Sequence, residues 1–275
     1  MSLLADRVIA VTGAASGIGR GLAVALASRG AHLALADIDE AGLEETERLA
    51  KAAGRPRVSR HVVDVADRAA VYAFADASAQ AHGAVDGVVN NAGVALTDTV
   101  ETLAYDDFEW IMGINFWGVV YGTKAFLPRL KERPSAWIVN VSSIFGIIGV
   151  PSQSAYNATK FAVRGFTEAL RQELHGTSVA VSCVHPGGIK TNIARRARHG
   201  RSHDGMSREE AVATFDQKLA RTSAEEAGRI IADGMEARAP RIMVGADARI
   251  GDVMQRVLPV RYANVARALS RRVRS

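Results

Sequence analysis

The chain has 275 residues, of which 48% are hydrophobic and 23% charged, and its formal net charge is +5. This composition can bury a large core and argues against extensive disorder, and α/β folds often reach about 250 residues as a single domain. The excess charge lies in residues 251–275, with six arginines and one aspartate, so residues 1–250 sum to zero and do not suggest a general polyanion-binding protein.

Cys183 is the single cysteine, which excludes a disulfide framework and favours a reducing, cytoplasmic compartment. It lies in an apolar run and is expected to be a small buried hydrophobe. Asp6 and Arg7 interrupt the first residues before an apolar core develops, so no secretory signal is expected. Residues 134–159 carry no charge, but their polar side chains, glycines and prolines favour a buried strand and an active-site loop over a membrane span.

Short β-branched runs alternate with longer alanine- and charge-rich stretches from the first residues onward. Helices are predicted over Glu40–Ala52 and Arg68–Ala81, with Asp39 and Asp67 as their N-caps and a glycine after each. The strands are continuous apolar runs, which predicts helices on both faces of the sheet. Strands are predicted at Val8–Val11, His32–Ala36, Arg57–Val63, Gly87–Val89, Trp137–Val141, Val179–Val184 and Arg241–Val244.

This alternation predicts an α/β protein with a single doubly wound Rossmann domain over residues 1–250. We expect a parallel sheet of about seven strands in the order 3-2-1-4-5-6-7, with helices on both faces. Residues 190–222 form a polar, arginine-rich stretch that we interpret as a mobile loop or substrate lid. Residues 251–275 form a basic C-terminal extension.

The first strand runs into a glycine-rich turn whose residues are Gly13, Ala14, Ala15, Ser16, Gly17, Ile18 and Gly19. A helix should follow this turn, continue to Arg29 and end at Gly30. The glycines permit a tight turn and close approach of the backbone to a pyrophosphate, and the helix N-terminus offers N–H donors to the anion. Between a strand and a helix, this pattern predicts a dinucleotide-binding turn.

Asp37 stands eighteen residues beyond Gly19, at the end of the second predicted strand. An acid there can accept hydrogen bonds from the adenosine ribose hydroxyls and repels a 2′-phosphate. Asp37 or Asp39 could instead cap the next helix, and Asp39 suits the cap better. Neither Ser16 nor Ile38 is basic, so the sequence favours NAD over NADP.

Tyr156 and Lys160 are four residues apart in a segment that opens a predicted helix, which continues through Phe161–Leu174 and puts both side chains on one face. A phenol with a pKa of about 10 is a poor base at neutral pH. An adjacent ammonium and a positive nicotinamide favour the phenolate, and lowering the pKa by about 3 units takes roughly 4 kcal/mol. Taken alone, the pair is equally compatible with an ordinary surface contact.

The glycine turn occurs in one order and spacing with four further motifs, namely Asn90-Asn91-Ala92-Gly93, Ser143, Tyr156-x-x-x-Lys160 and Pro186-Gly187. Together they resemble the short-chain dehydrogenase/reductase family over roughly residues 5–245. The resemblance implies an NAD(H)-dependent oxidoreductase that interconverts a secondary alcohol and a ketone.

Four catalytic positions are implied by this resemblance. Tyr156 would exchange the substrate proton, Ser143 would stabilise charge on the substrate oxygen, and Lys160 would lower the Tyr156 pKa and hold the nicotinamide ribose. Ser143, rather than Ser142, lies thirteen residues before Tyr156 at the family's serine position. Asn115 would anchor a water in a proton relay, or alternatively hydrogen-bond back to its own helix.

The resemblance also implies the cofactor contacts. These are Gly13, Ser16, Gly17, Ile18 and Gly19 at the pyrophosphate turn; Asp37, Ile38, Asn91, Ala92 and Gly93 at the adenosine ribose; Asp64 and Val65 at the adenine; and Tyr156, Lys160, Pro186, Gly187, Ile189 and Thr191 at the nicotinamide end. The scattered histidines show no ligand spacing, so no metal is expected.

The apolar residues after Ser143 are Ile144, Phe145, Ile147, Ile148 and Val150. They suit an apolar substrate, such as a steroid-like, terpenoid or medium-chain alcohol, or they pack on the protein itself. Reduction of a 3-oxoacyl thioester is an alternative, but biosynthetic reductions usually use NADPH, which Asp37 disfavours. A non-catalytic dinucleotide-sensing or scaffold protein would not need the proton chemistry of the four catalytic positions.

A homodimer or homotetramer is implied by the resemblance, through the helix that carries Tyr156 and its neighbour. Phe161, Phe166 and Leu170 could form part of this face or line the core. No nucleic-acid partner is expected. In the extension, a basic amphipathic helix is predicted over Val260–Val273, after Pro259. It could dock on the protein near residues 190–222, bind an anionic membrane weakly, or fray, and we favour docking.

Overall fold

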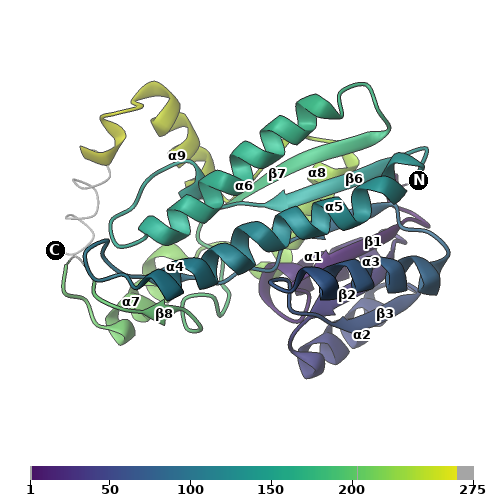
Figure 1. Cartoon of the computed structure of the whole chain (residues 1–275), viewed down its shortest axis with the longest axis horizontal. Helices are drawn as coiled ribbons and strands as arrows, with labels where there is room; N and C mark the ends of the chain where they lie inside the picture. The colour runs from purple at the N-terminus through teal and green to yellow at the C-terminus, as the bar shows by residue number, and fades with distance from the viewer. Residues whose placement is uncertain (1, 203, 265–275) are drawn as a thin grey trace.

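In the computed structural model, which describes residues 2–202 and 204–264, the strands form a seven-stranded parallel sheet (Figure 1). Its order is β3-β2-β1-β4-β6-β7-β9, which is the predicted order when these seven strands are counted along the chain. The strands are β1 (Val8–Thr12), β2 (His32–Asp37), β3 (Val58–Val62), β4 (Gly87–Asn90), β6 (Ala136–Val141), β7 (Val179–Pro186) and β9 (Arg241–Val244). The predicted Rossmann fold is confirmed.

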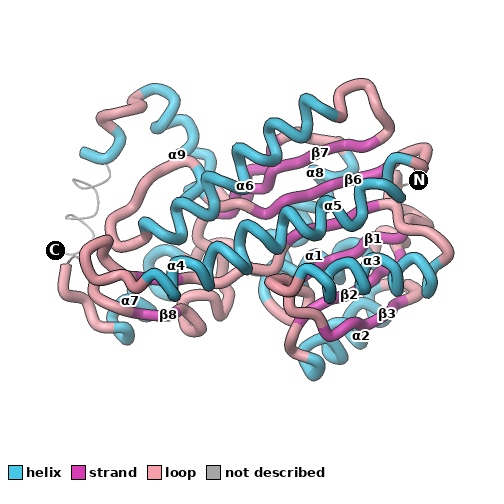
Figure 2. Tube along the Cα trace, viewed as in Figure 1, coloured by secondary structure: helices cyan, strands magenta, loops and turns pink. Residues whose placement is uncertain are grey.

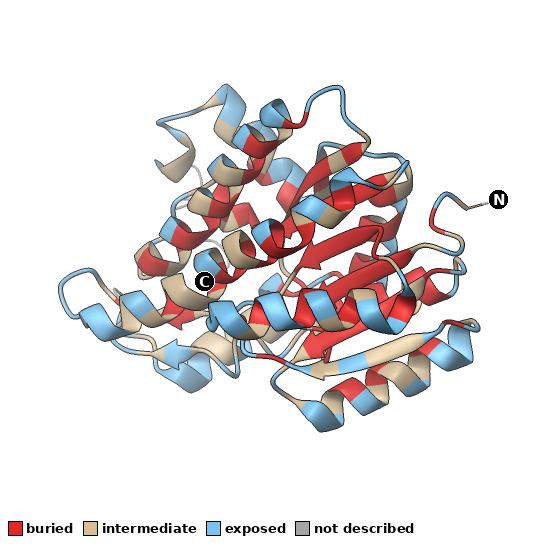
Figure 3. Ribbon diagram, turned by 45° about the vertical axis from the view of Figure 1, so that its right-hand side comes forward, coloured by how far each residue is buried: buried red, intermediate tan, exposed pale blue. Residues whose placement is uncertain are grey.

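Helices cover both faces of the sheet, as the continuous apolar strands predict (Figure 2). Successive residues of β1 show why, because Ile9 and Val11 belong to one apolar core while Val8 and Ala10 belong to the other. One face carries α1 (Gly17–Ala27), α2 (Glu40–Ala53) and α8 (Ala224–Glu236), and the other carries α3 (Arg68–His82), α5 (Gly118–Lys131) and α6 (Ser154–Glu173). The strands between these layers are mostly buried (Figure 3).

Local capping sets the helix ends much as the sequence predicts. The Asp39 carboxylate accepts a hydrogen bond from Gly42 N and begins α2, and Asp67 accepts from Ala69 N and Ala70 N and begins α3. Helix α1 ends at Ala27, two residues before the predicted end, because the chain turns there toward Gly30, whose φ is +85°.

Two features of the fold were not predicted. Helix α4 (Tyr105–Met112) continues into α5 through a π-helical turn, Gly113–Trp117. A second, two-stranded parallel sheet joins β5 (Leu96–Thr97) to β8 (Arg198–His199). Two-residue strands carry no readable periodicity, which is why the sequence did not indicate them.

The second sheet anchors part of the segment 190–222. The Arg198 guanidinium lies 3.7 Å from the Trp110 ring centroid and donates to Asp107 Oδ1 at 2.6 Å, so β8 is also fixed to α4. The rest of the segment contains α7 (Arg208–Thr214) and a π-helical turn, Phe215–Leu219. The part near β8 is therefore held by specific contacts.

Helix α9 (Ala246–Val257) follows β9 and begins before residue 251, where the extension was expected to start. Beyond it, the Tyr262 hydroxyl accepts a hydrogen bond from Gly149 N at 2.9 Å, so the extension contacts the loop after β6. Residues 265–275, which include most of the predicted helix Val260–Val273, lie outside the described residues. No helix in the described ranges has the length and apolarity needed to span a bilayer.

Candidate active site

The carboxyl ends of β1 and β4 are joined by side chains. Thr12 Oγ1 accepts hydrogen bonds from Asn91 N at 3.0 Å and Ala92 N at 3.1 Å. The Asn91 amide nitrogen donates to Thr12 O at 2.9 Å and Gly13 O at 3.1 Å. The segment 91–93 therefore supports the glycine turn from behind, which accounts for the pairing of these two motifs.

The glycine turn has the geometry of an anion-binding helix N-terminus. Gly13 has φ +64°, and a Cβ there would lie 2.7 Å from Ala92 Cα, so only glycine fits. Within the described chain, the Ser16 side chain makes no capping hydrogen bond to α1, which leaves the first N–H groups of that helix available to an anion. Thr191 packs against this turn. A Cβ added to Gly17 would lie 3.0 Å from Thr191 Cγ2.

The two aspartates after β2 have separate roles. Asp39 caps α2, while Asp37 Oδ2 accepts from Ala15 N at 2.9 Å and Oδ1 accepts from Asp39 N at 3.1 Å. Asp37 is therefore fixed beside the glycine turn, with Ile38 exposed next to it. Further along the same edge, Asp64 is exposed and Val65 is buried.

Ser143, Tyr156 and Lys160 converge from β6 and the first turns of α6. The Ser143 side chain lies close enough to the Tyr156 hydroxyl to lower its pKa as a hydrogen-bonding group. Lys160 Nζ lies 5.7 Å from the Tyr156 ring centroid and donates to Val141 O at 3.1 Å. Ser142 faces elsewhere, because its hydroxyl donates to Lys160 O at 2.7 Å and so holds α6 to the end of β6.

Burial dominates the protonation of this group. It raises the pKa of Tyr156 to about 12, against a smaller lowering by the hydrogen bond with Ser143. It also lowers the pKa of Lys160 to about 8. The sequence predicts a depressed pKa for Tyr156, but the Lys160 ammonium is 5.7 Å from the ring and does not offset the burial. The protein by itself therefore keeps Tyr156 protonated.

Asn115 is fully buried in the π-helical turn and does not hydrogen-bond back to its own helix through its side chain. Its Oδ1 accepts from Val94 N at 2.8 Å, and its Nδ2 donates to Val94 O at 2.9 Å and Thr159 Oγ1 at 3.2 Å. A Cβ at Gly93 would lie 3.2 Å from Asn115 Oδ1 and 3.4 Å from Lys160 Nζ. These two side chains therefore meet at Gly93, while a water-anchoring role for Asn115 stays a prediction.

The carboxyl end of β7 brings the last group of predicted contacts to the same edge. Gly187 N donates to Val244 O at 2.9 Å, so Pro186 and Gly187 leave the sheet beside β9. Ile189 is buried and pairs with Thr222, which fixes the start of the segment that carries Thr191.

Two residues that the sequence did not single out hold the site in place. Asn157 Nδ2 donates to Phe145 O at 2.6 Å and Ile148 O at 2.7 Å, and its Oδ1 accepts from Val150 N at 3.1 Å. His185 Nδ1 lies 3.1 Å from Ser143 O, and burial lowers the pKa of His185 to about 4, so the neutral ring donates to that carbonyl. Asn157 is next to Tyr156 in the sequence, but the sequence does not indicate which backbone groups its side chain hydrogen-bonds.

The apolar loop after Ser143 divides between the two roles considered for it. Ile144 and Ile147 are buried with Ala248 of α9, so they pack on the protein. Phe145 is partly exposed, and its ring meets the Tyr156 ring edge-on at 6.0 Å between centroids. The side of the loop next to Tyr156 therefore offers an apolar surface.

The chain is similar to known oxidoreductases along most of its length. The model of the short chain dehydrogenase family matches residues 7–202. The putative oxidoreductase SadH of Mycobacterium tuberculosis is 47% identical over 270 residues, which cover 98% of this chain and 96% of that protein. Levodione reductase of Leifsonia aquatica is 34% identical over 194 residues, covering 70% and 73%. A Burkholderia phymatum short chain dehydrogenase/reductase, solved in complex with NAD, superimposes with a TM-score of 0.84 at 28% identity, covering 93% and 95%.

Replacing Asn157 with alanine tests its role as the clamp of the loop 144–150. The change removes three hydrogen bonds and should lower the free energy of unfolding by about 2–3 kcal/mol, measured by denaturant titration. The Val150 amide should also exchange its hydrogen faster. The exposed Asn192→Ala is the control and should leave both quantities unchanged. Equal stability of Asn157→Ala and the wild type would contradict the clamp.

Proposed function

The chain belongs to the short-chain dehydrogenase/reductase family, and on that premise we propose that it is an NAD-dependent enzyme that interconverts a secondary alcohol and its ketone. The observation that carries the proposal is the convergence of the Ser143 hydroxyl and the Tyr156 phenol, with Lys160 Nζ 5.7 Å from the Tyr156 ring centroid. These groups lie at the sheet edge that also holds the glycine turn. A hydroxyl donor, a buried phenol and a cation in one place suit proton exchange with a substrate oxygen.

The residues at the glycine turn fit NAD. The free N–H groups at the start of α1 suit its pyrophosphate, and the fixed Asp37 carboxylate suits the adenosine ribose hydroxyls and repels a 2′-phosphate. The remaining contacts are assigned as the family resemblance implies, with Asp64 and Val65 at the adenine and Ile189 and Thr191 at the nicotinamide amide. When bound, NAD⁺ supplies the hydride acceptor and a positive charge next to Tyr156.

In alcohol oxidation, the Tyr156 phenolate takes the hydroxyl proton as the carbon loses its hydride. The Ser143 hydroxyl donates to the substrate oxygen and stabilises the charge that develops there. Lys160 would hold the nicotinamide ribose, and the positive nicotinamide would add its charge to that of Lys160, so that Tyr156 ionises only in the loaded site. In ketone reduction, the protonated Tyr156 returns its proton to the oxygen. Asn115 holds the Lys160 side of the site in place for proton exchange with solvent.

The substrate is proposed to be apolar. Phe145 presents its ring beside Tyr156, and Ile148 and Val150 on the same loop are partly exposed. The likeness to levodione reductase supports reduction of a carbonyl group. The segment around β8, which pairs with β5, is proposed to act as part of a substrate lid.

Assembly into a homodimer or homotetramer is proposed through α5 and α6. Of the three residues considered for this face, Phe166 and Leu170 pack with the core, and Phe161 is exposed. Trp117 is also exposed and stacks on Tyr121 with 5.8 Å between ring centroids. Exposed aromatic side chains on neighbouring helices favour contact with a second copy.

A screen of secondary alcohols with NAD⁺ at mildly alkaline pH, following absorbance of the reduced cofactor, tests the reaction. Apolar cyclic or medium-chain alcohols should be oxidised, and the matching ketones should be reduced with NADH. Absence of turnover with every alcohol, while NAD still binds, would contradict the proposed reaction.

Tyr156→Phe tests the acid/base, because it removes only the hydroxyl. We expect kcat to fall by more than about 100-fold with NAD affinity unchanged, measured by steady-state kinetics and cofactor titration. The control is Tyr72→Phe at an exposed tyrosine of α3, which should keep full activity. Retention of more than about a tenth of wild-type kcat would assign the proton to another group.

Cofactor preference tests the role of Asp37. The wild type should have a higher kcat/KM with NADH than with NADPH, because the carboxylate repels the 2′-phosphate. Asp37→Ser combined with Ile38→Arg should shift the ratio toward NADPH, since arginine supplies a partner for the phosphate. A wild type that prefers NADPH would overturn the assignment.

Light scattering at micromolar concentration tests assembly. The wild type should have the mass of a dimer or tetramer, and Trp117→Ser combined with Phe161→Ser should shift it toward the monomer because both exposed aromatics are lost. A monomeric wild type, or an unchanged mass in the double variant, would argue against this face.

A further inference from the structure

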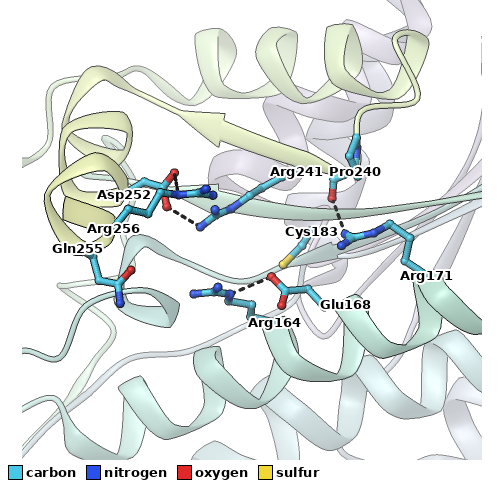
Figure 4. Close-up of a pocket in the computed structure, with 9 residues that line it drawn as sticks. All are labelled: Arg164, Glu168, Arg171, Cys183, Pro240, Arg241, Asp252, Gln255 and Arg256. Carbon is cyan, nitrogen blue, oxygen red and sulfur yellow. Dashed lines mark hydrogen bonds and ion pairs between the residues drawn. The ribbon is translucent and has the colours of Figure 1, made fainter. Parts of the chain in front are cut away.

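A cavity of about 420 Å³ opens between α6, α9 and the outer strands β7 and β9 (Figure 4). None of the four proposed catalytic residues is among its lining residues. Cys183 and Pro240 are the less polar parts of its wall. The charged side chains around it are Arg164, Glu168, Arg171, Arg241, Asp252 and Arg256.

The carboxylates around the cavity are too few for its arginines. Glu168 is paired with Arg164 at 2.9 Å. Asp252 forms ion pairs with two guanidinium groups, those of Arg256 at 3.1 Å and Arg241 at 2.7 Å. Arg171 donates to the Pro240 carbonyl at 3.3 Å and has no carboxylate partner among the described residues. Four arginines and two carboxylates leave the cavity with two positive charges in excess.

Arg241 in particular has an unused donor. Its Nη2 is paired with Asp252 Oδ1 at 2.7 Å, but its buried Nε has no hydrogen-bond acceptor within residues 2–202 and 204–264. Burial lowers the pKa of Arg241, against the opposing effect of Asp252. A guanidinium that is partly desolvated and incompletely paired gains stability from an additional anion.

We propose that this cavity binds a small polar dianion, such as a phosphate monoester or a dicarboxylate. Planar guanidinium groups present paired donors that match the oxygens of both anions. Two negative charges neutralise the excess positive charge, and the volume lies within the range of small-molecule sites, about 300–1,000 Å³. It is larger than a single phosphate, which leaves room for the group that carries the anion.

The proposal of an anion site does not depend on the proposed reaction, but the cavity and the active site share strand β7. Cys183 and His185 lie on the same face of β7, because they are two residues apart in a strand. Cys183 forms the floor of the cavity, and His185 holds the Ser143 carbonyl. The cavity therefore lies behind the active site, and its ligand does not compete with an alcohol or ketone.

Isothermal titration with sodium phosphate, sulfate and succinate, each against sodium chloride of equal ionic strength, tests the proposal. We expect saturable binding at one site per chain and a raised Tm with at least one dianion, but not with chloride. Tighter binding of phosphate and sulfate than of succinate identifies a phosphate-type ligand, and the reverse order identifies a dicarboxylate. No saturable binding with any of the three, or equal stabilisation by chloride, overturns it.

Variants locate the binding to this cavity. Arg171→Gln and Arg241→Gln should each weaken it by about tenfold or more, because each removes a charge-assisted donor. Arg171 is the safer variant for folding, since the hydrogen bond that its side chain makes within the described part of the chain goes to a backbone carbonyl. Arg208→Gln, at an exposed arginine of α7, is the matched control and should bind like the wild type. Wild-type affinity in Arg171→Gln and Arg241→Gln overturns the assignment.

Discussion

The contact between Ser143 and Tyr156 depends on the parallel direction of the sheet. Ser143 follows β6, and Tyr156 enters with α6, the helix that leads on to the neighbouring strand β7. Because β6 and β7 run in the same direction, the chain must return along the sheet, and α6 begins at the edge where β6 ends. The glycine turn after β1 reaches this edge for the same reason. The parallel topology thus brings the Ser143 hydroxyl, the Tyr156 phenol and the N-terminus of α1 to the same edge of the sheet.

Three buried or partly buried asparagines then convert this arrangement into a fixed geometry. Asn91 holds the backbone of the glycine turn, Asn115 holds Val94, and Asn157 holds the loop after Ser143. Asn115 and Asn157 each accept from an N–H and donate to a C=O of an irregular segment, because a carboxamide can do both, whereas Asn91 donates to two carbonyls. Loops that lack a sheet partner would otherwise leave these groups unpaired.

The parts of the fold with local signals could be predicted from the sequence. Apolar runs located the seven strands, and Asp39 and Asp67 marked helix starts because a cap involves only the next few residues. The β5–β8 pairing and the targets of Asn157 depend on contacts between distant segments, so no local pattern encodes them. Motif spacing indicated that Ser143, Tyr156 and Lys160 would lie together, but it carried no information on their protonation. The pKa of Tyr156 depends on burial, which follows only from the packed structure.

Burial moves Tyr156 and Lys160 toward their neutral forms, and this affects how the two directions of the proposed reaction differ. Burial raises the pKa of Tyr156 to about 12 and lowers the pKa of Lys160 to about 8, so both shifts favour the neutral pair over a phenolate beside an ammonium. Ketone reduction uses the phenol in the form that the protein already favours. Alcohol oxidation needs the phenolate, and its cost must be met by positive charge brought next to Tyr156 together with the Ser143 hydrogen bond. Burial makes ionisation of Tyr156 unfavourable in the protein alone. Loss of the Tyr156 proton is therefore expected only when the cofactor is bound.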